Sequence, residues 1–163
     1  MVAKGCQCPY KYGPGKPWKP SEWPNWVEQL ARDVEVFLQI PSGTFNSVNA
    51  NRYTAASENL NWHSDNEKLF LKSAWDRDVL IASVSFGGSR KFGIRRNNKD
   101  KVDASFLLND GDILTMDGRL QETHKHTVFP IRLNKDDPIP EPRYNLTFRT
   151  IFKHVAVCPC RTL

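Results

Sequence analysis

The chain has 163 residues, which is enough for one domain with a buried core and too few for two ordinary domains. Its 23 Lys and Arg residues outnumber its 18 Asp and Glu residues, and the net charge of +5 suits an anionic partner such as nucleic acid without specifying one. No apolar run approaches the roughly 20 residues of a membrane span, and the start, MVAKGCQCPY, lacks the apolar stretch of a signal peptide. We expect an intracellular monomer, in the cytoplasm or nucleus, with no membrane partner.

Residues 1–24 are expected to form an arm in front of the folded domain. Five prolines and two glycines lie between residues 9 and 24, so this stretch cannot be a helix and is a poor central strand. Its aromatic side chains have two open interpretations, because they can stack on nucleic-acid bases or pack the arm onto the core. These side chains are Tyr10, Tyr12, Trp18 and Trp23.

An amphipathic helix is predicted directly after the arm, over residues 25–39. Apolar side chains recur there at helical spacing, and Glu28, Arg32 and Glu35 take the opposite side. Pro41 and Gly43 follow the last apolar position, so the helix should end before them.

After residue 44 the apolar period changes from helical spacing to two, which is typical of strands. Turn-forming pairs such as Gly87–Gly88 and Asp110–Gly111 separate the short apolar runs. Eight short strands behind one helix predict a mainly β fold, a double-sheet jelly roll over residues 25–154, followed by a Cys-containing tail over 155–163. The predicted strands are residues 45–53, 61–65, 80–86, 91–96, 103–108, 112–116, 124–131 and 143–152.

The stretch NWHSDNE, residues 61–67, holds a histidine and an aspartate two positions apart. Successive side chains of a strand alternate between faces, so His63 and Asp65 would share one face and could bind one metal ion. A polar edge or turn would produce the same short pattern. This pair alone therefore leaves both interpretations open.

The last predicted strand carries RYNLTFR, in which one face is polar and the other apolar. A solvent-exposed face over a core face is the ordinary interpretation. Arg143 and Arg149 stand roughly 20 Å apart along the strand, and side chains that lean inward would leave about 6–8 Å between their guanidinium groups. A short dicarboxylate fits this gap, and arginine binds carboxylates with two hydrogen bonds.

Two histidines and one carboxylate on one face are the usual ligands of non-haem Fe(II) oxygenases, many of which use a dicarboxylate cosubstrate. The third ligand would come from His124, His126 or His154. His124 and His126 share a face of one predicted strand, so spacing does not choose between them.

Five motifs occur in the order found in one enzyme family. They are NRYTAASENLNWHSDNE, LIASVSFGGSRKFGIRR, LNDGDILTMDG, HKHTVFP and RYNLTFR. Over about residues 44–152 the chain resembles the AlkB-like dioxygenases that depend on Fe(II) and 2-oxoglutarate, and within them the nucleic-acid demethylase branch. The resemblance implies the double-stranded β-helix form of the jelly roll. It also implies that His126 is the third iron ligand beside His63 and Asp65.

The resemblance further implies how the cosubstrate is bound. Arg143 would hold the remote carboxylate of 2-oxoglutarate, and Arg149 the carboxylate at the keto end beside the iron. Asn51 and Tyr53 would hydrogen-bond the cosubstrate, and Asn145 would support it. The implied activity is oxidative demethylation of bases of the 1-methyladenine or 3-methylcytosine type in nucleic acid.

Two departures from the family pattern concern the substrate. Asn66 and Glu67 stand where family members that repair nucleic acid often have two acids, so only Glu67 would attract a cationic methylated base. The arm before the helix is short for a lid that extracts a base from a duplex, which favours single-stranded RNA or DNA. An oxygenase of a protein or small molecule and a catalytically silent nucleic-acid-binding module are the alternatives.

Two further groups have open interpretations. Cys6, Cys8, Cys158 and Cys160 are free thiols, or they form a four-thiolate zinc site that joins the two ends of the chain. The basic run over residues 90–101 is a solvated hairpin or an edge that contacts phosphates.

Overall fold

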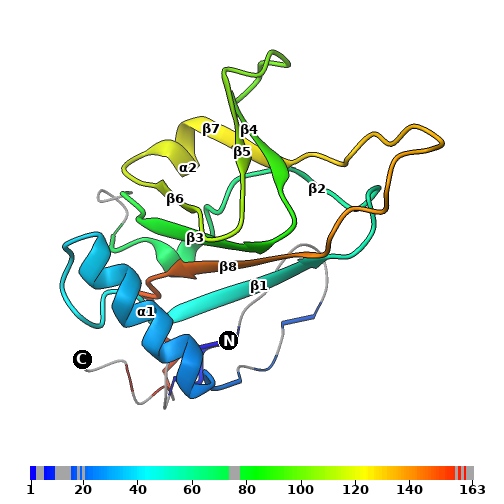
Figure 1. Cartoon of the computed structure of the whole chain (residues 1–163). Helices are drawn as coiled ribbons and strands as arrows, with labels where there is room; N and C mark the ends of the chain where they lie inside the picture. Colours follow the sequence, from blue (N-terminus) through cyan, green and yellow to red (C-terminus); the bar gives the residue numbers. More distant parts are fainter. Residues whose placement is uncertain are drawn as a thin grey trace.

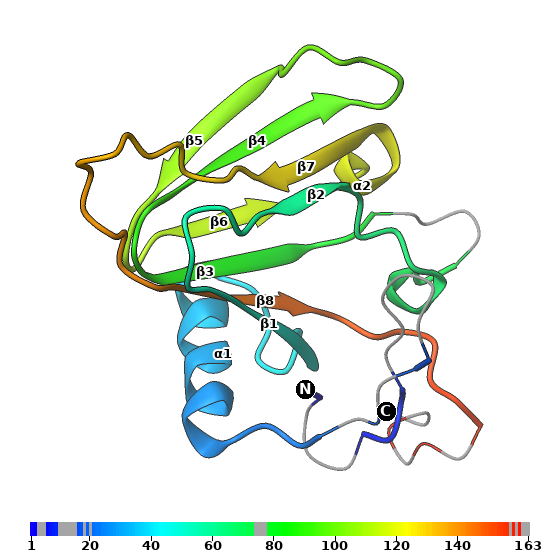
Figure 2. The ribbon, with the colours of Figure 1, turned by 90° about the vertical axis from the view of Figure 1, so that its right-hand side faces the viewer.

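Two four-stranded antiparallel sheets face each other, and one long helix covers the outer face of the first (Figure 1, Figure 2). This architecture comes from a computed structural model, which describes residues 1–2, 6–9, 16–17, 19, 21–73, 78–156, 158 and 160. The expected mainly β jelly roll with a flanking helix is therefore confirmed. In the described ranges, no helix is long and apolar enough to cross a membrane.

Every predicted element is present, with ends that differ by a few residues. The prediction of a strand over 143–152 is wrong at its end, because pairing with the neighbouring strands stops at Arg149. The elements are α1 Asn25–Phe37, β1 Ser47–Tyr53, β2 Leu60–His63, the 3-10 helix η1 Lys68–Phe70, β3 Ile81–Gly87, β4 Arg90–Arg96, β5 Ala104–Leu108, β6 Ile113–Met116, α2 Leu120–Thr123, β7 His124–Val128 and β8 Arg143–Arg149.

Strands from opposite ends of the chain pair with each other, and this pairing builds the site. The first sheet has the order β1-β8-β3-β6 and the second the order β2-β7-β4-β5. In the first sheet, Asn51 is opposite Asn145 and Tyr53 is opposite Arg143. In the second sheet, His63 is opposite His126. Residues about 60 to 95 positions apart in the sequence thus become neighbours across the strands.

The apolar face of α1 packs on the outer face of the first sheet. Val27, Ala31 and Val34 are buried against side chains of that sheet, which include Leu146 and Phe148 of β8. The opposite face of β8 looks into the space between the two sheets. The first sheet is therefore covered on both sides, and the interpretation of RYNLTFR as a strand with a solvent-exposed polar face is wrong.

The arm is described only in part. Trp23 packs its ring edge on Phe148 at 6.1 Å between centroids, so this residue packs the arm onto the core. Tyr10, Tyr12 and Trp18 lie outside the described residues.

Glu35 is buried, although the helical pattern placed it on the polar side of α1. Only 2% of its surface is exposed. Its carboxylate accepts hydrogen bonds from the backbone N–H groups of Gly43, at 2.9 Å, and Phe45, at 2.7 Å. Glu35 therefore fixes the turn that leads from α1 into β1, which explains why a charged side chain is buried.

Replacing Glu35 should destabilise the fold through this turn. In Glu35→Leu the buried N–H of Phe45 loses its acceptor, so we expect the free energy of unfolding to fall by about 1–3 kcal/mol. Urea unfolding followed by circular dichroism measures this difference. The matched control is Glu28→Leu on the exposed side of α1, where the loss of an exposed pair with Arg32 should change the stability by under about 0.5 kcal/mol. Equal effects of the two changes would contradict the role of Glu35.

Candidate active site

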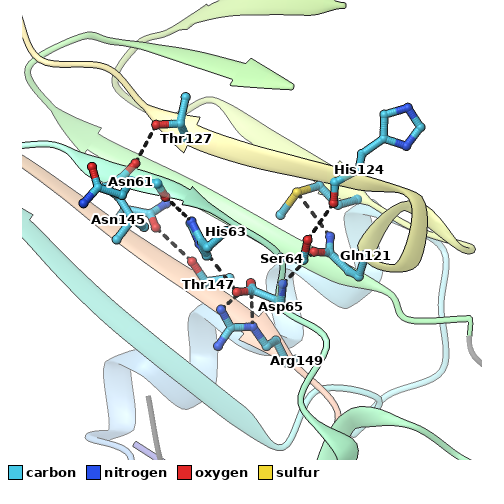
Figure 3. Close-up of polar contacts among 12 residues, drawn as sticks. Asn61, His63, Ser64, Asp65, Gln121, His124, Thr127, Asn145, Thr147 and Arg149 are labelled. Carbon is cyan, nitrogen blue, oxygen red and sulfur yellow. Dashed lines mark hydrogen bonds and ion pairs between the residues drawn. The ribbon is translucent and has the colours of Figure 1, made fainter. Parts of the chain in front are cut away.

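His63, Asp65 and His126 converge between the two sheets. One potential ligand atom from each lies within 4.8 Å of those of the other two. The two imidazole rings are 4.1 Å apart between centroids, and His63 Nε2 is 3.6 Å from Asp65 Oδ1. Figure 3 shows His63, the last residue of β2, and Asp65, on the segment that follows β2, beside β8. Two nitrogen donors and one carboxylate so arranged could hold one metal ion.

Of the other two candidate histidines, neither lies in this group. The ring of His124 points away from it (Figure 3), with Nδ1 2.7 Å from the hydroxyl of Thr123. His154 lies beyond the end of β8, among Cys6, Cys8 and Cys158. The choice that spacing left open therefore falls on His126, in agreement with the family resemblance.

The ring of His63 is held in the orientation and tautomer that a metal requires. Its Nδ1 lies 2.7 Å from the backbone carbonyl of Asn61. A carbonyl only accepts, so Nδ1 carries a hydrogen and Nε2 is the ring nitrogen that faces Asp65. His126 is stacked on Phe92 at 5.5 Å, and burial lowers its pKa to about 4. A neutral imidazole at ordinary pH is the form that binds metals.

Asp65 is an ionised carboxylate with one oxygen already occupied. Arg149 donates to Oδ2 from Nε, at 3.1 Å, and from Nη2, at 2.5 Å. Burial acts to raise the pKa of Asp65, but Arg149, with smaller effects of His126 and His63, outweighs it and the pKa lies below its usual value. Oδ1 accepts no hydrogen bond from the described residues. It is the atom left for a cation.

Gln121 holds the backbone of Asp65 in place, and the sequence pattern did not predict this role. The backbone N–H of Asp65 donates to Gln121 Oε1 at 2.9 Å, while Gln121 Nε2 contacts Met116 Sδ at 3.5 Å (Figure 3). Gln121 is 97% buried, since only 3% of its surface is exposed. Gln121 lies in the short helix α2, just before β7, and the sequence around it contains no motif that indicates a functional site.

A cavity of about 460 Å³ opens between the sheets next to this group. The residues predicted to bind 2-oxoglutarate line it from β1 and β8, together with the three candidate metal ligands. These predicted residues are Asn51, Tyr53, Arg143, Asn145 and Arg149. The alternating faces of two paired strands thus supply a polar wall for a small ligand.

Arg143 is a buried cation without an anion among the described residues. It is 1% exposed. Among the described residues it forms one hydrogen bond, from Nη2 to Ser85 Oγ at 2.9 Å. Nε and Nη1 have no partner in the described ranges. Burial lowers its pKa, Tyr53 opposes this and Arg90 adds to it. A buried, unpaired charge is costly, so this guanidinium is suited to receive a carboxylate.

Arg90 is buried, so both interpretations of the basic run over residues 90–101, a solvated hairpin or an edge that contacts phosphates, are wrong for this residue. It is 1% exposed, and Nη2 donates to the carbonyl of Ala55 at 3.1 Å. The alternation of β4 turns Arg90, Phe92 and Ile94 to one side, where Arg90 lies close enough to Arg143 to help lower the pKa of Arg143. The period of two in this strand was the signal that could have identified it.

Of the three remaining candidate residues, Asn145 lines the cavity, whereas Asn66 and Glu67 do not. Asn145 donates to Ser83 Oγ at 2.6 Å and to the carbonyl of Val84 at 3.1 Å, so its amide joins β8 to β3. Asn66 is exposed, and Glu67 is half-buried at the start of η1. Neither of these two is among the described residues that line the cavity. The role of Glu67 toward a substrate stays a prediction.

The sequence matches the family model of the 2OG-Fe(II) oxygenase superfamily over residues 3–149. The chain belongs to this superfamily. It is 33% identical over 138 residues to human alpha-ketoglutarate-dependent dioxygenase alkB homolog 3, a match that covers 79% of this chain and 44% of that protein. It is 32% identical over 133 residues to mouse DNA oxidative demethylase ALKBH2, covering 77% of this chain and 52% of that protein. The chain therefore spans about half the length of these relatives.

The solved structure of OsALKBH1 is similar to this 2OG-Fe(II) oxygenase chain in its fold. The TM-score is 0.59 at 24% sequence identity, over 81% of this chain and 68% of that one. The superfamily is named for 2-oxoglutarate and Fe(II), and the residues fit both. Asp65 Oδ1 lacks a donor and Arg143 lacks an anion among the described residues, as a site for a cation and a dicarboxylate requires. Fe(II) and 2-oxoglutarate are the cofactors of this family, and this chain has the residues to bind them.

Removing the support of Gln121 should weaken metal binding. In Gln121→Ala the N–H of Asp65 loses its acceptor and the carboxylate is less well oriented, so we expect the affinity for Mn(II), used as an oxygen-stable probe, to fall about 10–100-fold. Titration followed by electron paramagnetic resonance measures the free ion. Lys125→Ala, an exposed change on β7, is the control and should leave the affinity unchanged. An unchanged affinity in Gln121→Ala would contradict this role.

Removing the charge of Arg143 should separate cosubstrate binding from metal binding. We expect Arg143→Met to bind 2-oxoglutarate about 10–100-fold more weakly, because charge-assisted hydrogen bonds are lost, and to bind Mn(II) as before. Calorimetric titration of the Mn(II)-loaded protein measures the affinity for 2-oxoglutarate, and electron paramagnetic resonance titration of the metal-free protein measures the affinity for Mn(II). Arg52→Met, on the exposed side of the paired strand β1, is the matched control. The Met variant without ligands should be no less stable than the parent, since an unpaired buried charge has gone. Unchanged 2-oxoglutarate affinity would contradict the assignment.

Proposed function

We propose that this chain oxidatively demethylates N-alkylated bases of nucleic acid, using Fe(II), O2 and 2-oxoglutarate. The observation that carries the proposal is the arrangement in one cavity of His63, Asp65 and His126 beside the unpaired guanidinium of Arg143. The similarity to alkB homolog 3 and to proteins described as DNA oxidative demethylases supports the choice of substrate class.

In this proposal, each residue of the cavity has a definite task. His63, Asp65 and His126 hold the iron, and Arg149 keeps Asp65 ionised and in place. Arg143 would neutralise the remote carboxylate of 2-oxoglutarate, with Asn51 and Tyr53 on the neighbouring strand as hydrogen-bond partners, and Arg149 would hold the carboxylate at the keto end. Asn145 fixes the cavity wall through β3. The bound cofactors supply the oxidising chemistry that hydroxylates an N-methyl group, and the hydroxymethyl product releases formaldehyde and restores the base.

The protein's contribution is orientation and charge, and not a chemical group of its own. The strand pairs fix the two ends of the cavity relative to each other, so a dicarboxylate held by Arg143 extends toward the metal group. Burial of His126 and Asp65 keeps bulk water from the ligand atoms. Both are in the protonation states that bind a cation at neutral pH.

For the nucleic acid we propose a single strand, bound by a monomer acting inside the cell. The net charge of +5 and the basic β4–β5 hairpin favour a polyanion. In this hairpin Arg95 lies over the ring of Trp62 at 4.5 Å and pairs with Asp100 at 3.1 Å, while Lys99 is exposed. Glu67 is assigned to the cationic methylated base.

The decisive experiment follows methyl groups by mass spectrometry. Single-stranded DNA and RNA oligonucleotides with 1-methyladenine or 3-methylcytosine, and their duplexes, are incubated with protein, Fe(II), ascorbate and 2-oxoglutarate. We expect loss of one methyl group from single strands at about ten times the duplex rate or more, because a paired base must first leave the stack. His126→Ala is the control and should remove the activity.

The other outcomes decide between the alternatives. Succinate formation without any loss of methyl groups would contradict a nucleic-acid substrate and favour an oxygenase of a protein or small molecule. Absence of both succinate and demethylation in the iron-loaded protein would favour a catalytically silent nucleic-acid-binding module. Equal rates on single strands and duplexes would contradict the proposed preference for single strands.

A further inference from the structure

A second cluster of potential metal ligands lies where the two ends of the chain meet. Cys6 and Cys8 come from the first segment, and His154 and Cys158 from the segment after β8; one ligand atom from each lies within 4.8 Å of the others. Figure 2 shows the dark blue first segment beside the red segment that follows β8. None of these residues belongs to the group of His63, Asp65 and His126.

The distances in this cluster match those around one tetrahedral zinc ion. Zinc with Zn–S of about 2.3 Å and Zn–N of about 2.0–2.1 Å requires about 3.8 Å between two sulfurs and about 3.6 Å between sulfur and nitrogen. The sulfurs of Cys6 and Cys158 are 3.8 Å apart. His154 Nδ1 is 3.9, 3.2 and 3.4 Å from the sulfurs of Cys6, Cys8 and Cys158. Four ligand atoms that all lie within 4.8 Å of one another leave room for one ion among them.

The surroundings of the cluster are those of a structural metal site. The three cysteines are buried and form no disulfide. The N–H of Gln7 donates to the sulfur of Cys158 at 3.3 Å, and the N–H of Val155 donates to that of Cys8 at 3.4 Å. Such N–H···S bonds orient thiolates around a metal. Packing of apolar thiols alone would not bring one imidazole nitrogen close to three sulfurs.

We infer that Cys6, Cys8, His154 and Cys158 bind one Zn²⁺ as a closed Cys3His site that joins the first segment to the segment after β8. Four protein ligands leave no open position, so the ion is structural and not catalytic. The proposed site differs from the four-thiolate alternative because the structure brings Nδ1 of His154 next to three of the four sulfurs, while Cys160 lies beside Cys6 and Cys158 without belonging to the group. The reason is local: the N–H of Cys158 donates to the carbonyl of Val155 at 2.9 Å, and this turn returns Cys158 to His154.

The proposed zinc site borders the cavity between the two sheets. Cys8 lines the cavity wall together with Val2, whose backbone pairs with Ser47 of β1 and with Glu22. A zinc ion at Cys8 would therefore fix part of that wall at a distance from the iron ligands.

The test uses the full chain, purified without chelators from cells supplied with zinc, with metal content measured by mass spectrometry. All proteins in this test carry His126→Ala, so that the iron site does not add zinc, and we expect one zinc per chain in this parent and in Cys160→Ser. His154→Ala and Cys158→Ser should lose most of the zinc. Retention in His154→Ala together with loss in Cys160→Ser would overturn the Cys3His assignment in favour of four thiolates, and a parent without stoichiometric zinc would overturn the site itself.

A second measurement needs no variant, so it remains decisive if a variant does not fold. The parent is exchanged with Co²⁺ at this site, and X-ray absorption and visible spectra report the ligands. Three sulfurs and one nitrogen around a tetrahedral ion support the inference. Four sulfurs, or no sulfur among the ligands, would overturn it, whereas Co²⁺ at His63, Asp65 and His126 would add only oxygen and nitrogen. Because metal content and coordination are measured without turnover, either result is independent of whether the chain demethylates nucleic acid.

Discussion

The buried polar face of β8 is the constraint on which the rest of the site depends. β8 pairs with β1 on one side and β3 on the other, so its alternate side chains must enter the space between the sheets. Two of those side chains are arginines, and each buried guanidinium requires an anion. Arg149 finds one in Asp65, and Asp65 is thereby held as an ionised metal ligand. Arg143 has no anion among the described residues, so binding of a carboxylate there would remove the cost of an unpaired buried charge.

This arrangement couples the charges of the protein to those of its cofactors. A dicarboxylate brings two negative charges and Fe(II) two positive ones, so their joint binding adds little net charge to a buried space. Without them, Arg143 stays uncompensated, and Arg90 nearby adds a second buried cation. Neutral His126 and ionised Asp65 need not lose protons to bind the metal at neutral pH. The site is thus prepared electrostatically before either cofactor arrives, which is the ordinary way in which proteins orient reactive groups.

Local patterns predicted those parts of the site that lie within one strand. The period of two in RYNLTFR and the spacing of His63 and Asp65 indicated which side chains share a face, and pairing of the strands joined the two sets. Spacing did not choose His126 over His124; the family resemblance did, and the ring directions agree with it. Gln121 and Arg90 were missed because their roles depend on burial by elements distant in sequence. Glu35 was misplaced for the same reason, since its partners lie in the turn beyond the helix.

The ends of the chain raise a different physical problem, because the arm contains few residues able to join a sheet. Proline has no N–H to donate, and five of them occupy residues 9–24. Within the described residues, the β-bridges of the arm are those of Val2, with Ser47 of β1 and with Glu22 at the other end of the arm. Side-chain contacts must therefore attach the arm to the rest of the domain. In the proposed zinc site, three thiolates and an imidazole would do this through their bonds to one ion, where a larger apolar surface would otherwise be needed. The same segment lines the cavity, so attachment of the ends and the shape of the catalytic space depend on one cluster.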